Sequence, residues 1–135
     1  NRSSYTAVAK GAVKVFANMG AFVALMDDGT VKSWGDSKSG ATMGLDAEFA
    51  LRFGKVVDIW ATNDSFIALR SNGQAVAWGG YGGGSPTREQ RKLLASDVIS
   101  IDVADTFLGN FIVRKKDGTI VVLGSNFGAI QQLLR

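Results

Sequence analysis

Short apolar runs alternate with polar turns along the chain, and three of the turns have the same composition. Asp28-Gly29, Asn72-Gly73 and Asp117-Gly118 each separate two arms rich in β-branched, aromatic and other apolar residues. Such dipeptides supply the positive φ that both central residues of a type I′ turn require, so the pattern predicts three β-hairpins. The arms are residues 22–26 and 30–34, 66–70 and 74–78, and 111–114 and 119–123.

A third extended segment precedes each hairpin, and a helical patch follows it. The extended segments are residues 13–17, 56–61 and 98–103, and the helical patches are residues 46–53, 85–95 and 130–135. Each unit is therefore predicted to run strand, strand, strand, helix. The link from 104 to 110 in the third unit is longer than its counterparts, which predicts a bulge or short loop there.

The first two helical patches carry N-terminal signals and apolar side chains that we expect to face a core. The expected N-caps are Asp46 for the first helix and Ser85, followed by Pro86 at the first helical position, for the second. The expected inward side chains are Phe49 and Phe53 in the first helix and Leu93 and Leu94 in the second.

The three units repeat at a nearly constant period. The turn glycines lie 44 residues apart (73 − 29) and then 45 residues apart (118 − 73), a spacing typical of stacked supersecondary units. The arms at 22–25 and 66–69 are apolar on both faces, so each sheet is expected to be covered on both sides. Trp34, Trp78 and Leu123 share one repeat position and predict an internal packing layer.

We therefore predict a mainly β fold with three β-β-β-α units stacked as propeller-like blades. The units are approximately residues 11–54, 55–96 and 97–135, within a single repeat domain, residues 1–135. Three blades are too few to close the usual ring, which leaves an open arc or a compact three-unit variant.

Composition excludes several classes of site. The 135 residues are 46% hydrophobic and 20% charged with a net charge of +3, which is ordinary for a globular domain and does not indicate nucleic-acid binding. The sequence contains no cysteine and no histidine, so Ser-His and Cys-His nucleophiles and the common zinc sites are excluded. We predict no enzymatic activity, no metal and no cofactor. No apolar run approaches the roughly 20 residues that a membrane-spanning helix needs.

Both ends of the sequence suggest a longer precursor. The chain starts at Asn1 without a methionine, and residues 130–135 stop inside an expected helix with no glycine or proline to end it. We expect a processed or truncated start and a longer natural protein.

A glycine-rich loop, Gly79 to Ser85, leads into the second helix. Amides at a helix N-terminus attract anions, but the Lys-Ser/Thr pair of a P-loop is missing and the loop follows a hairpin. We interpret the loop as a connection between blades, with weak anion binding as the alternative. If the protein were an enzyme, this loop would be its expected active-site segment.

Exposed cations and one tryptophan are the candidate contacts for a partner. Basic residues gather on the second helix and at the third hairpin turn, and one tryptophan is expected at a rim. These residues are Trp60, Arg88, Arg91, Lys92, Arg114, Lys115 and Lys116. Because acidic residues are interleaved with them, ordinary solvated faces are the competing interpretation.

The hairpin ends resemble a known repeat family. Residues 27–35, Asp-Asp-Gly-Thr-Val-Lys-Ser-Trp-Gly, and residues 71–79, Ser-Asn-Gly-Gln-Ala-Val-Ala-Trp-Gly, are similar to the regulator of chromosome condensation repeats. Residues 34–44 continue the pattern, residues 123–128 repeat it more weakly, and the resemblance covers residues 13–128. It implies a β-propeller, in that family of about seven blades, and guanine-nucleotide exchange on a small nuclear GTPase with chromatin contacts.

This sequence departs from that family in its short period, its helices and its three units, so exchange activity is not carried over. Compact repeats of this style resemble proteins of algal lineages, which implies an accessory role inside an organelle.

We therefore hypothesise a non-catalytic protein–protein interaction or scaffold module. It would be an accessory subunit of a larger assembly, for example an organellar, membrane-associated photosynthetic one. Its partners would be other protein subunits, with no specific nucleic acid; peripheral association with a membrane complex is compatible with this. The expected location is an organelle interior after processing, with cytoplasm or nucleus as alternatives. The alternative function is nucleotide exchange or chromatin binding by family analogy.

Overall fold

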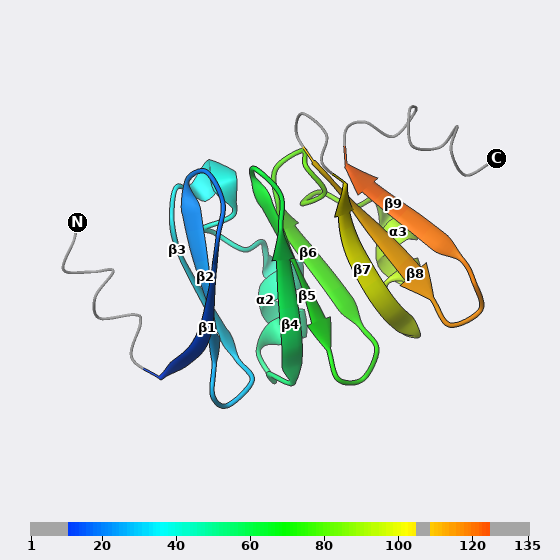
Figure 1. Ribbon diagram of the computed structural model, residues 1–135, viewed down its shortest axis with the longest axis horizontal. Helices are drawn as coiled ribbons and strands as arrows, with labels where there is room; N and C mark the ends of the chain where they lie inside the picture. The colour runs from blue at the N-terminus through cyan, green and yellow to red at the C-terminus, as the bar shows by residue number, and fades with distance from the viewer. Residues whose placement is uncertain (1–10, 105–108, 125–135) are drawn as a thin grey trace.

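The computed structural model describes residues 11–104 and 109–124, which form three separate antiparallel sheets in a row (Figure 1). Each sheet is a meander of three strands taken in chain order. The strands are β1 (Ala12–Ala17), β2 (Ala21–Met26) and β3 (Val31–Gly35); β4 (Val56–Ala61), β5 (Ser65–Arg70) and β6 (Ala75–Gly79); and β7 (Val98–Ala104), β8 (Asn110–Lys115) and β9 (Ile120–Gly124). The mainly β repeat fold is confirmed, and the row is not closed into a barrel.

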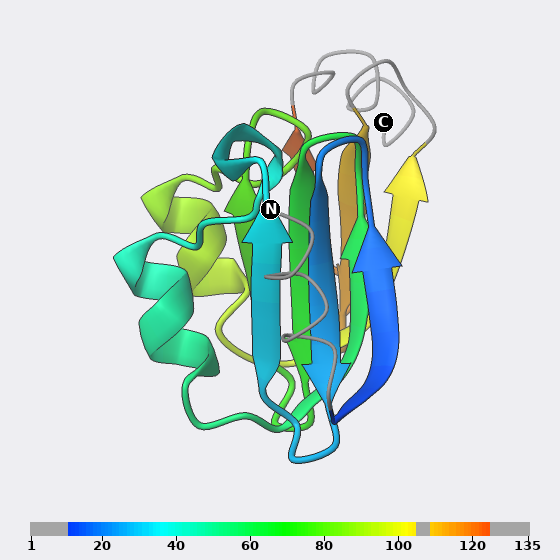
Figure 2. The same cartoon turned by 90° about the vertical axis from the view of Figure 1, so that its left-hand side faces the viewer.

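A 3-10 turn, η1 (Ser37–Ser39), and two short helices, α2 (Leu45–Leu51) and α3 (Arg88–Leu93), connect the sheets. Both α-helices lie on the same side of the row (Figure 2). Each helix leaves one unit and packs against the last strand of the next: α2 on β6, and α3 on β9. The helices therefore join consecutive units. The third expected helix, residues 130–135, and most of the link from 104 to 110 lie outside the described residues.

The hairpin turns differ from the predicted type I′ geometry. Gly29 has a φ of 81°, whereas Asp28 does not have a positive φ. The amide of Gly29 donates to the carbonyl of Met26 at 3.0 Å, and the amide of Met26 donates to the carbonyl of Thr30 at 2.8 Å. This is a type I turn followed by a left-handed glycine in a bulge. The other two hairpins repeat the same bonds.

A side-chain cap explains this turn type. The carboxylate of Asp28 accepts the amide of Thr30 at 3.0 Å and also its hydroxyl. Asn72 and Asp117 accept the amides of the residues two positions later, at 3.1 and 2.9 Å. Such local bonds hold the capping residue in the right-handed region. The hydrogen bonds from the Thr30 side chain and amide lower the pKa of Asp28.

The α3 N-terminus also differs from the prediction. The N-cap is Thr87, whose hydroxyl accepts the amide of Gln90 at 3.1 Å, while the Gln90 side chain accepts the amide of Thr87 at 2.9 Å. This reciprocal capping box satisfies two helix amides, so the expected cap at Ser85 is wrong. Of the two expected core leucines, Leu94 is buried and Leu93 is exposed.

The contact between consecutive sheets is apolar and uses equivalent strand positions in both cases. The face that each sheet turns toward the preceding unit uses five register-equivalent positions. They are Ile59, Phe66, Ala68, Val76 and Trp78 in the second unit and Ile101, Phe111, Val113, Val121 and Leu123 in the third, and all ten are buried. The predicted packing layer is thus confirmed at Trp78 and Leu123, as is the burial of β5 on both faces. For the first sheet these predictions are wrong, because Trp34 is only partly buried and Phe22 is 39% exposed on a face that no other sheet in the described ranges covers.

One loop glycine fits closely into the first of these contacts. Gly40 has a φ of 103°, and a Cβ on it would lie 2.8 Å from Cδ2 of the Phe66 ring. Its carbonyl accepts the indole N–H of Trp78 at 2.9 Å. Gly83 occupies the same place against Phe111 in the second contact, with a φ of 112°. The repeated loop glycine is therefore required by close approach as well as by backbone conformation.

Charged residues replace apolar ones on the two outer sheet faces. The first sheet carries the equivalent set Val15, Phe22, Ala24, Lys32 and Trp34, with exposed Lys32 at the position of Val76. On the opposite outer face, exposed Arg114 occupies the position of Leu25 and Leu69. A further sheet stacked on either face would bury one of these charges, which have no ion-pair partner within the described residues, and this disfavours such stacking.

Candidate protein-interaction surface

Large apolar side chains line the outer face of α2. Leu45 is 84% exposed, Phe49 is 64% exposed and Phe53 is 66% exposed. Their spacing of four residues places them on one side of the helix and its final turn. We call these three residues the α2 stripe. Exposed apolar patches of this kind mark sites of interaction with other molecules.

The α2 stripe is exposed because small residues face the sheets. Ala47 and Leu51, one turn apart on the opposite side of the helix, are buried against the first core. Ala47 and Leu51 take the inner positions where α2 packs against β6, so the residues spaced between them point away from the sheets. The expectation that Phe49 and Phe53 are buried is therefore wrong. The expected cap is also wrong, because the N-cap of α2 is Gly44 and Asp46 lies in the first turn.

An arginine completes the stripe. The guanidinium of Arg52 lies 4.6 Å from the centroid of the Phe49 ring and 4.5 Å from that of Phe53. These cation–π contacts hold the two rings beside a positive charge at the surface. Aromatic residues and arginine are the side chains most enriched at energetically important positions of protein interfaces.

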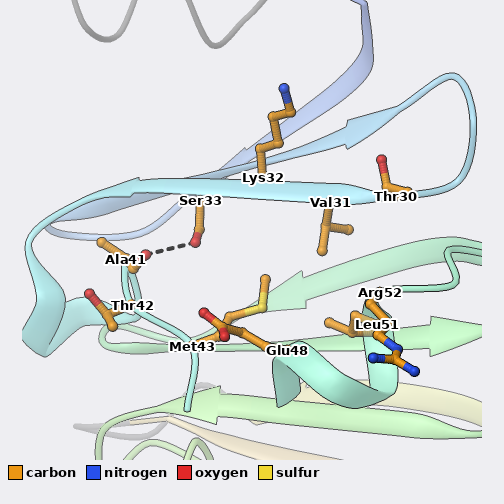
Figure 3. A pocket seen from close by; sticks show the side chains of 10 residues that line it. All are labelled: Thr30, Val31, Lys32, Ser33, Ala41, Thr42, Met43, Glu48, Leu51 and Arg52. Carbon is orange, nitrogen blue, oxygen red and sulfur yellow. Dashed lines mark hydrogen bonds between the residues drawn. The ribbon is translucent and has the colours of Figure 1, made fainter. Parts of the chain in front are cut away.

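Hollows lie on both sides of α2, including one toward β3 and one toward α3. The first, about 550 Å³, lies between β3 and α2, and Figure 3 shows Val31, Lys32 and Ser33 on one side with Glu48, Leu51 and Arg52 on the other. The hydroxyl of Ser33 donates to the carbonyl of Ala41 at 2.7 Å and closes one end. The second, about 250 Å³, lies between α2 and α3, and its residues include Ala47, Phe49, Ala75, Arg91 and Leu94. The stripe is thus a ridge with space on both sides for a partner's side chains.

The cations expected to contact a partner fall into two groups. Arg88, Arg91 and Lys92 lie on α3, where Arg91 is 4.0 Å from the carboxylate of Asp46 and borders the second hollow. Lys92 is 3.7 Å from Glu89 within the same helix. Only this group lies close to the α2 stripe.

The second group is at the end of another element. Arg114 and Lys115 are the last two residues of β8, and Lys116 follows in the turn to β9, at the lower end of the third sheet in Figure 1. The Nε of Arg114 donates to the hydroxyl of Ser100 at 3.1 Å.

Trp60 is half-buried and packs against the second core, where its register equivalent Phe16 packs against the first. Trp60 is thus mainly a packing residue.

The glycine-rich loop is organised around the chain's own carboxylate. Asp64 accepts the amide of Tyr81 at 3.0 Å, the amide of Gly82 at 2.9 Å and the hydroxyl of Ser65 at 2.8 Å. These are the loop amides that an external phosphate would need. Their use by Asp64 favours the connecting role of the loop over anion binding.

Residues 11–104 and 109–124 contain neither a metal-binding cluster nor a membrane-spanning helix. No group of three or more acidic side chains is placed to hold a metal ion there. No helix in those ranges has the length and apolar character needed to cross a membrane. Comparison with known proteins finds no family model and no curated protein that matches this chain.

Proposed function

We propose that this protein is a non-catalytic protein-interaction module, an accessory subunit of a larger assembly, with the α2 stripe as its main contact surface. The observation that carries the proposal is the exposure of Leu45, Phe49 and Phe53 in one row, with Arg52 between the rings. Two other strongly exposed apolar side chains, Met19 (83% exposed) and Tyr81 (77% exposed), lie apart from one another in two different loops, whereas the three stripe residues form one row.

The size of the stripe indicates what a partner must add. Burying one exposed leucine or phenylalanine contributes about 1.5–3 kcal/mol, so three contribute roughly 5–9 kcal/mol. Association costs an estimated 4–15 kcal/mol in lost freedom, so the stripe alone supports only weak binding. A partner that also fills the two hollows gains the additional contacts that stable binding requires.

The residue inventory supports a non-catalytic role. The sequence offers no histidine or cysteine as nucleophile or general base. The most suggestive catalytic segment, the loop from Gly79 to Ser85, uses its central amides to bind Asp64. The same inventory fits a module whose task is to hold other subunits.

The test compares two tagged variants in the native source. Phe49→Ser combined with Phe53→Ser removes the stripe, and Met19→Ser, at a residue 83% exposed outside α2, is the matched control. We expect the wild-type chain and the control to retain the same co-purifying subunits, and the stripe variant to lose them. Equal recovery of those subunits with all three chains would overturn the proposal.

A further inference from the structure

Two opposite charges border the α2 stripe on one side. Glu48 and Arg52 are one helical turn apart, both are exposed, and both line the hollow between α2 and β3 (Figure 3). Within the part of the chain that the structure describes, Glu48 makes no ion pair. The stripe therefore has an unpaired negative charge and a positive charge on the same flank.

We infer that the α2 stripe binds the α2 stripe of a second copy of this chain, with the two helices antiparallel. This inference rests on the proposed function, since it names a partner for the same surface. A two-fold axis through the contact places Phe49 against Phe49 of the second copy, and Leu45 near Phe53 of the second copy. The stripe is thus complementary to itself.

The charges select the antiparallel orientation. In this arrangement Glu48 of each copy lies beside Arg52 of the other, which gives two attractive contacts on one flank, against one repulsive contact between the two Glu48 side chains near the axis. In a parallel pairing, the side of α2 that carries Glu48 meets the opposite side of α2 in the second copy. Glu48 then lies near Asp46 of the second copy, and the two acidic side chains repel. Charged residues beside an apolar seam set partner and orientation in helix pairs in the same way.

The outer sheet faces are less apolar than the α2 stripe, because their apolar side chains are less exposed, for example Phe22 at 39% and Ile120 at 42%. Both outer sheet faces carry charges at positions that are apolar between sheets, Lys32 on one side and Arg114 on the other. The contact at α2 involves one short helix and its bordering hollows, less than the roughly 1,200 Å² typical of stable interfaces. We therefore expect a reversible, concentration-dependent dimer of low affinity.

The test uses charge reversal and mixing, followed by sedimentation equilibrium of the purified chain. Glu48→Arg and Arg52→Glu each place like charges across the contact, so each variant alone should dimerise at least about tenfold more weakly than wild type. In an equimolar mixture the two positive side chains of one variant meet the two negative side chains of the other, so the mixture should associate as a heterodimer. Arg88→Glu, on α3, is the control for net charge, and its mixture with Glu48→Arg should not associate.

The outcomes separate this inference from the proposed function. Restored association in the first mixture, abolished by adding Phe49→Ser to both chains, supports antiparallel self-pairing. Wild-type chain that stays monomeric at every concentration, or a mixture that associates no better than its components, overturns it. The wild-type chain could be monomeric while its co-purifying subunits are still lost in the Phe49→Ser, Phe53→Ser variant. That result overturns self-pairing and leaves the proposed function standing. Urea unfolding of each variant confirms that loss of association is not loss of folding.

Discussion

Substituting the loop glycine at the first contact between sheets tests the stacking directly. In Gly40→Ala the new Cβ would lie 2.8 Å from Cδ2 and 3.1 Å from Cε2 of Phe66, a ring with no exposed surface. The ring sits in a packed core and cannot move aside, so overpacking costs about 1–3 kcal/mol. Displacement of the Gly40 carbonyl from the Trp78 indole removes a hydrogen bond of 2.9 Å, worth about 0.5–1.5 kcal/mol.

The matched control is Gly118→Ala. Gly118 has a φ of 90°, but a Cβ there meets no atom within 4 Å. Both substitutions therefore introduce backbone strain of about 1–2 kcal/mol, and only Gly40→Ala also overpacks the Phe66 ring and displaces the Trp78 hydrogen bond. The free energy of unfolding, from urea titration followed by tryptophan fluorescence, should fall by about 1.5–4.5 kcal/mol more in Gly40→Ala than in the control. Equal losses in the two variants would refute the proposed packing of sheet on sheet.

Three further predictions concern single side chains. Trp78→Leu should lower the free energy of unfolding by about 2–4 kcal/mol, because the Trp78 side chain is 2% exposed. Trp34→Leu, on the outer face of the first sheet, should lower it by less than about 1.5 kcal/mol. Urea unfolding measures both, and the reverse order would contradict the assignment of inner and outer faces. Because the pKa of Asp28 is lowered in the folded chain, its carboxylate stabilises the fold above the unfolded pKa, and this contribution is lost as pH falls through the lower folded pKa. NMR titration should give a value below 3.8 for Asp28, and Asp28→Asn should lessen the acid sensitivity of unfolding; a pKa at or above 3.8 would exclude the turn cap. Asp64→Ala leaves two loop amides without their acceptor and should destabilise by about 1–3 kcal/mol in urea, while an unchanged midpoint would show that the loop does not depend on Asp64.

The repeat and its hairpins are predictable from sequence because their signals are local. Asp-Gly or Asn-Gly with apolar arms recurs at a fixed spacing, and the strand ranges of the structure agree with the pattern to within about two residues. The turn type is harder to predict from sequence, because a side-chain hydrogen bond such as that from Thr30 to Asp28 competes with the type I′ preference of the Asp-Gly pair.

The candidate site is harder to predict because it depends on how closely two units approach. Phe49 and Phe53 have the spacing of a buried stripe, and only the packing of α2 against β6 shows that Ala47 takes the inner position. A sequence signal does exist, since Ala47 and Leu51 form an equally regular inner pair. The basic residues were conspicuous in the sequence, yet Arg114, Lys115 and Lys116 lie on a different element from the stripe.

The central claim is that the α2 stripe contacts another protein chain, and site-specific photocrosslinking tests it most directly. A photoreactive phenylalanine analogue is placed at Phe49 in one chain and at Tyr81, which is 77% exposed outside α2, in another. Irradiation in the native source is predicted to give a covalent adduct to a second protein chain from position 49 and none from position 81. Adducts from position 81 alone, or from neither position, would contradict the claim.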